Sequence, residues 1–452
     1  MTSFKMLCGM GRFCKYSSRY FKSYISLLFA FSLNATAQEI QWIPGWQSTS
    51  DMQIARAGAA IVSHNNKIYV IGGVDGVNFL SSVEVATVTT DGALSPWKNV
   101  RSMPEARGFV SAVVFNNRIY VVGGANGRYG KKLLNSVVSA AILESGELGR
   151  WRTENETLLT PRRCSKIFVN DNTLYALGGF GGALLDTVES SRFGVSGKLT
   201  PWKMQANHLV MPRYVNEVKR VGDLVLAIGG HHPSQGIGIK DVEMADLSAK
   251  VLSWKSVAPM QVGRYAFSSA VYKNRVYAFG GISGAEYLNS TEKLPVDNKI
   301  VSKKWSKSTN LPAFMANFTT MVVGDRIYVF GGSTRHEYLR KVWYASFNST
   351  GDIGYYGTKD ALDAFKLKVQ TAKKVTKLPN SGTVLESIAT NAYTYIRVLS
   401  KDKEIWLAAP ITEISIGKKI QFSEGVYMSN FYSKALKRNF AAILFVGTVS
   451  VE

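Results

Sequence analysis

Short apolar runs that end in a pair of glycines recur six times along the chain. The glycine pairs begin at residues 72, 123, 178, 229, 280 and 331, so the spacing is 51, 55, 51, 51 and 51 residues. A short continuous apolar run is typical of a strand that is covered on both faces, and the glycines allow the backbone to turn sharply after it. The pattern predicts six copies of one structural unit.

Each unit contains three further predicted strands. A run of small and apolar residues precedes the buried strand and is joined to it by a polar turn such as Asn65-Asn66, which is typical of a hairpin. A third run follows each glycine pair, for example residues 82–88. A fourth begins at an aromatic residue, which we expect to pack in the core. These aromatic residues are Trp97, Trp151, Trp202, Trp254, Trp305 and Tyr356.

Trp46 supplies a seventh candidate for the outer strand of six four-stranded blades. We expect the strand at Trp46 to complete the sixth blade, because such closure removes an exposed sheet edge and holds the ends of the ring together. The sequence leaves open whether Tyr356 takes that place instead.

The glycine pairs, the tyrosine just before most of them and the tryptophan about 25 residues later resemble the kelch-repeat family. The resemblance covers residues 38–357 and implies an all-β fold, a six-bladed kelch β-propeller. Kelch propellers include binding scaffolds, sugar mutarotases and a copper oxidase, so the resemblance assigns no activity by itself. Six repeats with this spacing are most similar to the bacterial exported type, including proteins similar to sialic acid mutarotase.

The pattern changes after the propeller. Residues 358–378 are rich in lysine and predict a short helix or a basic linker. Residues 379–452 predict a small OB-like β-barrel. Its expected strands are 383–388, 393–399, 404–410, 419–422 and 442–449.

The motifs at residues 406–410 and 428–431 resemble a small exported bacterial OB-like domain that is also found alone. Tyr393, Tyr395, Trp406 and Lys434 are candidates for an aromatic and basic binding face. Core packing is the alternative explanation of the aromatic residues.

Residues 1–37 predict a secretory signal peptide, because basic residues precede the apolar run 24–33 and the small residues 35–37. We therefore expect an exported protein, in the bacterial periplasm or outside the cell. No later run approaches the ~20 apolar residues of a membrane helix, so no transmembrane anchor is expected. Cys164 is then the one cysteine of the mature chain, which excludes an internal disulfide, and a structural role is favoured for it.

The formal net charge is +22, and removal of the five basic residues of the signal peptide leaves +17. The excess is spread along the chain without a basic run. Such a surface favours anionic partners and argues only weakly for nucleic acid. We expect an anionic glycan or protein partner and no nucleic acid.

The position 16 residues before each glycine pair is an arginine in five units and Met315 in the sixth. In one interpretation the guanidinium groups form a partial ring around the channel mouth and bind carboxylate, sulfate or phosphate. In the other, each arginine ties its blade to a neighbour through backbone carbonyl groups. The five residues are Arg56, Arg107, Arg162, Arg213 and Arg264.

The loops after the glycine pairs do not repeat, and a binding surface on a repeat scaffold is expected where the sequence varies. Candidate ligand-binding residues in these loops are Asn126, His231, His232, Arg335 and His336. Adjacent histidines seldom converge on one ion and no other ligand has suitable spacing, so we expect no metal and no cofactor.

Lys166 and Glu217 occupy a position, 12 residues before the glycine pair, that is small in the other four units. They are weak candidates for an acid and a base that open a sugar hemiacetal. A structural ion pair is the alternative. No serine–histidine–acid, zinc or phosphate-loop motif occurs.

Two functions are compatible with these features. We favour an exported binding protein that recognises a glycan or protein, expected to be anionic, through the loop face of the propeller. The alternative is a mutarotase or epimerase of acidic sugars such as sialic acid, in which arginines hold the carboxylate and Glu217 or a histidine moves the proton.

Overall fold

The computed structural model describes residues 40–194, 196–232, 238–297, 300–374, 378–390, 393–433 and 435–451. The predicted signal peptide and Lys434 lie outside the described residues. Among the helices described, none has the length and apolar character needed to cross a membrane.

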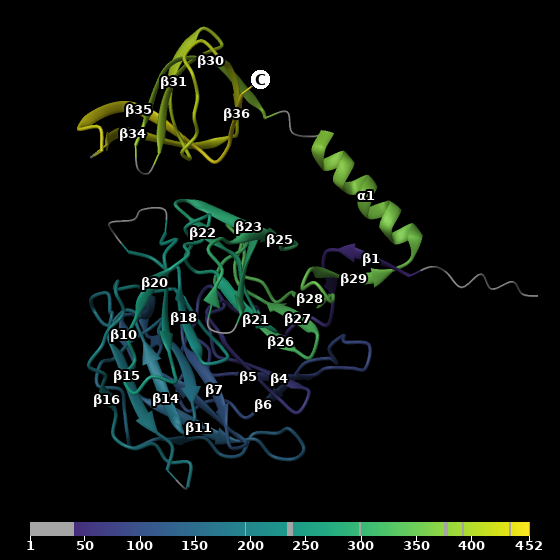
Figure 1. The fold of residues 1–452 in the computed structure, drawn as a ribbon, viewed down its shortest axis with the longest axis vertical. Coiled ribbons are helices and arrows are strands. Elements are labelled where there is room, and N and C mark those ends of the chain that lie inside the picture. Colours follow the sequence, from purple (N-terminus) through teal and green to yellow (C-terminus); the bar gives the residue numbers. More distant parts are fainter. Residues whose placement is uncertain are drawn as a thin grey trace, which may run out of the picture. The chain divides into compact units, whose positions relative to one another are not determined.

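Six antiparallel sheets follow one another along the chain and form the blades of a propeller (Figure 1). The first blade contains β3 (Ala60–His64), β4 (Lys67–Ile71), β5 (Val83–Thr87) and β6 (Lys98–Val100). The second contains β7 (Ser111–Phe115), β8 (Arg118–Val122), β11 (Val137–Ala141) and β12 (Arg152–Thr153). The third contains β13 (Lys166–Asn170), β14 (Thr173–Leu177), β15 (Val188–Arg192) and β16 (Lys203–Met204).

The fourth blade contains β17 (Glu217–Val221), β18 (Leu224–Ile228), β19 (Val242–Asp246) and β20 (Lys255–Val257). The fifth contains β21 (Ser268–Tyr272), the long hairpin β22 (Arg275–Ser283) and β23 (Glu286–Asp297), and the outer strands β24 (Ile300–Val301) and β25 (Ser306–Ser308). The sixth contains β26 (Thr319–Val323), β27 (Arg326–Phe330) and β28 (Val342–Phe347). The innermost strands contact one another in cyclic order, with β26 returning to β3, which confirms the predicted all-β six-bladed propeller.

The turn residues explain the repeated hairpins. Asn65 and Asn66 both have positive φ, 45° and 51°, between β3 and β4, as a tight two-residue hairpin turn requires. Gly123 and Gly124 have φ of 62° and 99°, and a Cβ on Gly123 would lie 2.7 Å from the Arg162 carbonyl oxygen of the next blade. The glycine pair therefore serves both a sharp turn and close contact between blades.

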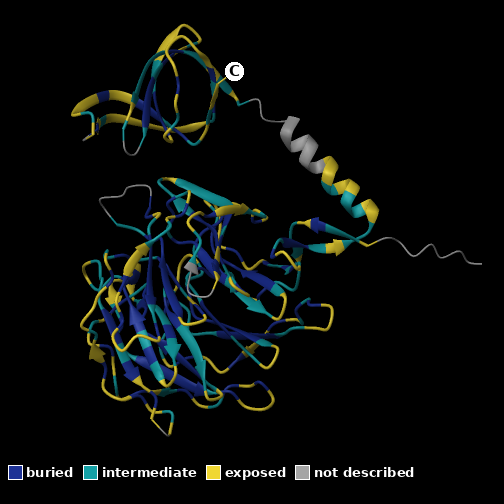
Figure 2. Cartoon of the chain, viewed as in Figure 1, coloured by how far each residue is buried: buried dark blue, intermediate teal, exposed yellow. Residues whose placement is uncertain are grey.

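The core lies between the blades. The second strand of each blade is buried (Figure 2), and its tyrosine is fully covered in four of them. Tyr69 donates to the Gly146 carbonyl at 2.8 Å and Tyr277 to the Gly351 carbonyl at 2.6 Å, so this hydroxyl links neighbouring blades. Burial raises the pKa of Tyr69 to about 12. The tryptophans that begin the outer strands, such as Trp97 and Trp305, are buried as predicted.

Two short strands at residues 41–48 close the ring of blades. Strand β2 (Gln47–Ser48) pairs with β28, and β1 (Gln41–Pro44) pairs with β29 (Ile353–Gly357). The Trp46 indole donates to the Asn310 carbonyl at 2.9 Å, and the Trp97 indole makes the equivalent bond to Ser50. Trp46 thus completes the sixth blade, as expected. Tyr356 is 62% exposed and packs on Trp42 instead.

Helix α1 (Lys359–Lys374) forms in the lysine-rich segment, in agreement with the predicted short helix. The chain then forms a seven-stranded sheet in the order β34-β35-β32-β31-β30-β33-β36. Its strands are β30 (Asn380–Ala389), β31 (Thr394–Ser400), β32 (Lys403–Ala409), β33 (Lys419–Phe422), β34 (Gly425–Ser433), β35 (Arg438–Val446) and β36 (Val449–Val451). Strands β32 and β35 are parallel and the other pairs are antiparallel.

Strands β34 and β36 were not predicted. Most of β34 is exposed, so its apolar residues lack the alternation that marks a half-buried strand. Tyr395 is buried and bonds to the Ser433 hydroxyl at 3.0 Å, while Trp406 packs against the same cluster. Core packing, the alternative explanation, therefore accounts for these two aromatic residues. The OB-like assignment stays a prediction.

Candidate functional site

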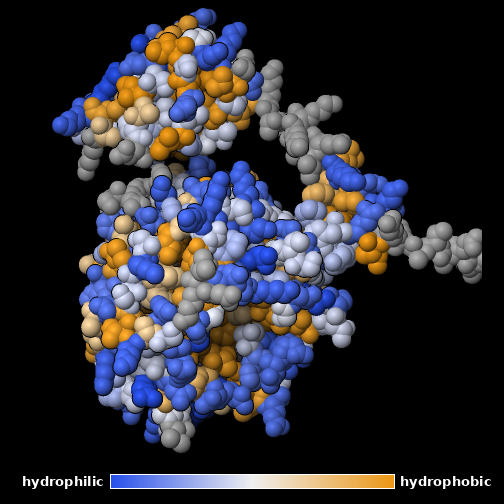
Figure 3. All heavy atoms as spheres, in the orientation of Figure 1, coloured by the Kyte–Doolittle hydropathy of each residue, from blue (hydrophilic) through white to orange (hydrophobic). Residues whose placement is uncertain are grey.

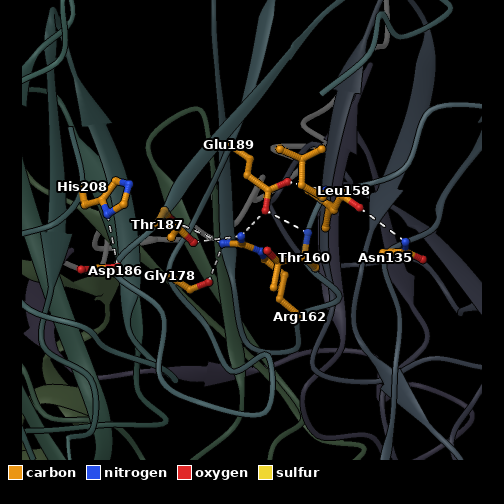
Figure 4. Close-up of polar contacts among 10 residues, drawn as sticks. Asn135, Leu158, Thr160, Arg162, Gly178, Asp186, Thr187, Glu189 and His208 are labelled. Carbon is orange, nitrogen blue, oxygen red and sulfur yellow. Dashed lines mark hydrogen bonds and ion pairs between the residues drawn. The ribbon is translucent and has the colours of Figure 1, made fainter. Parts of the chain in front are cut away.

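The repeated arginines are buried inside the propeller. Arg162 shows the arrangement (Figure 4): its guanidinium donates to the Gly178 carbonyl at 3.0 Å and the Thr187 hydroxyl at 3.0 Å, and it is paired with Glu189. The same carboxylate accepts the backbone N–H of Thr160 at 3.2 Å. Every donor in this network is directed at the protein itself.

The main chain of each arginine contacts the preceding blade. The Arg162 carbonyl accepts the N–H of Gly124 at 2.9 Å, while its side chain holds the first glycine of its own blade. All five arginines repeat the side-chain bond, at 2.8 to 3.1 Å, and all are at most 1% exposed. The predicted ring of accessible guanidinium groups is therefore not formed, because burial leaves no surface for an anion. The contacts match the other interpretation. The residues are Arg56, Arg107, Arg162, Arg213 and Arg264.

We call this arrangement, an arginine held by a buried glutamate and by backbone carbonyl groups, the clamp. Two blades depart from it. In the second blade Val138 replaces the buried glutamate, Arg107 lies 3.6 Å from the half-buried Glu105, and burial lowers the pKa of Arg107 to about 10. In the sixth blade Met315 and Trp343 replace both partners, so no charge is buried there. The arginine and its acid are thus lost together in the sixth blade.

Six residues, one per blade, form a narrow neck of the central channel. Each lies just before the innermost strand of its blade. All have φ between 47° and 59°, and five are not glycine. Such a conformation costs about 1–3 kcal/mol at a residue with a side chain. The neck residues are Gly58, Phe109, Cys164, Val215, Ala266 and Asn317.

Backbone hydrogen bonds join the neck residues of successive blades. The Cys164 N–H donates to the Phe109 carbonyl at 2.8 Å and the Asn317 N–H to the Ala266 carbonyl at 2.7 Å. Between the third and fourth blades, the Val215 N–H instead bonds to the Cys164 thiol. A cavity of about 50 Å³ lies within the neck, which suffices for water or one ligand substituent.

We expect Cys164 to be chemically inert in the folded protein. Burial raises the pKa of its thiol to about 11, and the reactive thiolate is scarce at neutral pH. Ellman's reagent at pH 8 should label the native protein at least about 100 times more slowly than the protein in guanidinium chloride. Equal rates in the two conditions would contradict the raised pKa of this half-buried thiol.

Lys166 and Glu217 meet across the boundary between the third and fourth blades. The Lys166 ammonium lies 2.6 Å from one carboxylate oxygen of Glu217, and Lys219 lies 3.2 Å from the other. Ser269 donates to Glu217 at 2.9 Å. Burial of Glu217 opposes its ionisation, but the two ammonium groups and the hydrogen bonds from Lys166 and Ser269 outweigh it and hold its pKa below the ordinary value.

Asn216 adjoins this ion pair in the wall of the neck. It is 1% exposed, and neither its amide nitrogen nor its amide oxygen has a partner among the described residues. A buried amide without partners is costly, so such a group calls for a ligand or water that both donates and accepts.

An arc of large side chains borders the neck on the third, fourth and fifth blades. Tyr214 packs edge-on to His231 with centroids 5.4 Å apart, and His231 packs against Tyr265 at 4.9 Å. Arg163 lies 5.1 Å over the Phe180 ring. We call these five residues the aromatic arc. The equivalent positions of the other three blades are small: Ala57, Val74, Gly108, Ala125, Ala316 and Ser333.

His231 is the predicted loop residue that lies in the arc. Burial, followed by the neighbouring His232, lowers its pKa, so the imidazole is neutral at pH 7. Its buried Nδ1 has no partner among the described residues. This imidazole nitrogen is a further unsatisfied polar group, beside two tyrosines.

The other loop candidates do not belong to the arc. Some already bind other groups of the protein, and the rest lie in other blades. Asn126 donates to Glu105 and to the Ala106 carbonyl, and Arg335 pairs with Glu286 at 2.6 Å. His336 is exposed in the loop of the sixth blade, and His232 has an interaction of its own. No cluster of three or more metal-ligating side chains occurs within the part of the chain described.

Sequence reasoning missed Tyr214, Tyr265 and Asn216. A signal was available: the residue after each registered arginine is large in three consecutive blades and small in the others. For Asn216 the signal was weaker, since only its burial without a partner distinguishes it.

The kelch motif model matches residues 55–85, 106–138, 263–312 and 315–344. Beta-scruin of Limulus polyphemus is 28% identical over 146 residues, which cover 32% of this chain and 16% of that protein. Kelch-like protein terF of Aspergillus terreus is 27% identical over 260 residues and 55% of each chain. The chain thus spans about half or less of these curated relatives.

A solved structure, described as the structure of YjhT, superposes with a TM-score of 0.55 at 14% identity and covers 69% of this chain and 99% of that one. This likeness concerns the fold. Together with the repeated sheets, the matches show that the chain carries kelch repeats that fold into a six-bladed β-propeller.

Proposed function

We propose that the protein is an exported binding protein that recognises an acidic sugar or glycan end at the loop-face mouth of its propeller. The observation that carries the proposal is the aromatic arc beside the unpaired amide of Asn216. Kelch propellers as a fold favour a binding role, and the finer choice of a glycan rests on the chemistry of this mouth.

The polar groups at the mouth fit a hydroxylated ligand. Because Asn216 is only 1% exposed, a ligand reaches its unpaired amide only with a small group that enters the neck, and that group must both donate and accept, as a sugar hydroxyl does. The rings of Tyr214 and Tyr265 supply apolar surface with polar ends, as is usual in ligand pockets. Arg163 and the partly exposed Lys166 add positive charge, which favours an acidic sugar over a neutral one.

The neck is too small for a sugar ring. Its cavity of about 50 Å³ accommodates a substituent such as a hydroxyl group, while the ring itself would lie against the arc. The small residues of the other three blades leave space in the mouth for the sugar ring. A ring in that space would lie against the arc, which supports a ligand held at the third to fifth blades.

Binding should depend on the arc and on Asn216. We expect the Asn216→Leu and Tyr214→Ala variants to lose at least tenfold in affinity for sialic acid, or for the best glycan of an array, by isothermal titration calorimetry. His336→Ala is the matched control, because it changes an exposed loop residue outside the arc. Unchanged affinity in both site variants would refute the proposed site.

The mutarotase alternative makes a different prediction. Glu217 is ionised, paired with two lysines and only 5% exposed, so it is a poor proton donor at neutral pH. We expect no acceleration of sialic acid anomer exchange by NMR. Acceleration that disappears in Glu217→Gln would replace the binding proposal by catalysis.

A further inference from the structure

A second cavity lies inside the channel, beyond the neck. It measures about 320 Å³, at the lower end of the size of ligand pockets. Residues of all six innermost strands, β3, β7, β13, β17, β21 and β26, line it. It shares Lys166 and Glu217 with the neck, so the two cavities adjoin. The visible outer surface of the propeller is mostly hydrophilic (Figure 3), whereas much of this lining is aliphatic.

The charges that line the channel cavity do not cancel. Lys166 and Lys219 contribute two positive charges and Glu217 one negative charge, which leaves a net charge of +1. The side chains of the two lysines are 32% and 31% exposed, while Glu217 is 5% exposed. A net positive charge concentrated in a confined space attracts a counter-ion.

The hydroxyl groups of the lining already donate to the protein. Ser111 donates to the Ser165 carbonyl at 2.7 Å, Thr319 to the Ala59 carbonyl at 3.0 Å, and Thr320 to the Ser269 carbonyl at 2.8 Å. Each ammonium group has three donors and gives one to Glu217. The lysines therefore retain donors for a further acceptor.

We propose that the channel cavity is an anion site, in which Lys166 and Lys219 hold one small monovalent anion opposite Glu217. One negative charge balances the net charge of +1 on the lining. A divalent anion would reverse the imbalance, and a cation would add to it. The chemistry fits a halide and a small carboxylate such as formate equally, so the two sources are separate arms of the test.

Of the groups proposed to bind the glycan, only Lys166 also belongs to the anion site, so Lys219→Met is the variant that separates the two sites. The anion site lies on the strands inside the channel, whereas the aromatic arc lies on the loops that border the neck. Tyr214→Ala should therefore weaken glycan binding and leave anion binding unchanged. Loss of one activity without the other distinguishes failure of this inference from failure of the proposed function.

The experiment is ³⁵Cl NMR of the mature protein, in which bound chloride broadens the line of the bulk ion. We expect excess broadening that saturates with chloride and falls at least fivefold in Lys166→Met and in Lys219→Met. Titration with sodium formate at constant ionic strength should remove it if carboxylates share the site, and leave it if the site selects halides.

Two variants test the charge argument. Glu217→Gln raises the lining charge to +2 and should strengthen chloride binding at least threefold. Lys98→Met, which removes an exposed lysine from β6, is the control for binding to the basic surface and should have no effect. Circular dichroism verifies that each variant is folded. No excess broadening in the wild type, or equal loss in Lys98→Met and Lys219→Met, would overturn the proposal.

Discussion

Glu189→Ala is expected to lower the free energy of unfolding by about 3–5 kcal/mol, because it leaves a buried guanidinium without its counter-charge. The variant also removes the acceptor of the Leu159 and Thr160 N–H groups, at 2.7 and 3.2 Å. Both side chains of the Arg162–Glu189 pair are fully covered, so water cannot replace the lost carboxylate. Urea denaturation of the purified protein measures the change.

An exposed ion pair provides the control. Asp51 pairs with Lys341 at 2.8 Å, and the lysine side chain is 56% exposed. Asp51→Ala should cost at most about 1 kcal/mol. If both variants cost the same, the buried clamp does not hold the blades together. A second comparison is the Arg162→Met, Glu189→Trp double variant, which copies the uncharged sixth blade and should be more stable than Glu189→Ala.

Trp46→Ala is expected to destabilise the propeller by about 2–3 kcal/mol, somewhat less than removal of a fully buried tryptophan. The indole packs against Phe279 and donates to Asn310, so its loss weakens the closure between the fifth and sixth blades. Thermal unfolding by calorimetry measures the effect, and the melting temperature should fall clearly.

Tyr356→Ala is the matched control for the closure. Tyr356 lies at the place that the repeat assigns to the outer aromatic residue of the sixth unit, yet it is mostly exposed. Its removal should cost less than about 1 kcal/mol. A larger cost for Tyr356→Ala than for Trp46→Ala would mean that the carboxyl-terminal strand closes the ring.

Much of the fold was predictable because each blade contributes an independent copy of the same signal. The register of the glycine pairs located the strands, and the repeated tryptophans identified core positions. The C-terminal unit has no repeat, and the exposed β34 was missed. A strand that gains its pairing from β35 and buries little surface leaves no alternation to detect.

The direction of the arginine side chains was less accessible from sequence, although a signal existed. In four blades an acid follows the arginine by 27 to 30 residues, and it is absent from the sixth unit, where methionine replaces the arginine. Loss of both partners in the sixth unit indicates contact between them, although the second unit keeps Arg107 with Val138 in place of the acid. The pairing of Lys166 with Glu217 was predictable from their shared register in adjacent blades.

The sequence by itself determined the number of blades, their strands and the residue types at each repeated position, because these follow from local turn chemistry and hydrophobic spacing. Only the tertiary structure decided which polar groups remain unpaired. Asn216 becomes notable because it is buried without a partner, and Lys166 and Lys219 because strands from six blades place both of them beside the single carboxylate of Glu217. Their surroundings come from residues far apart in the chain, and no local pattern records that.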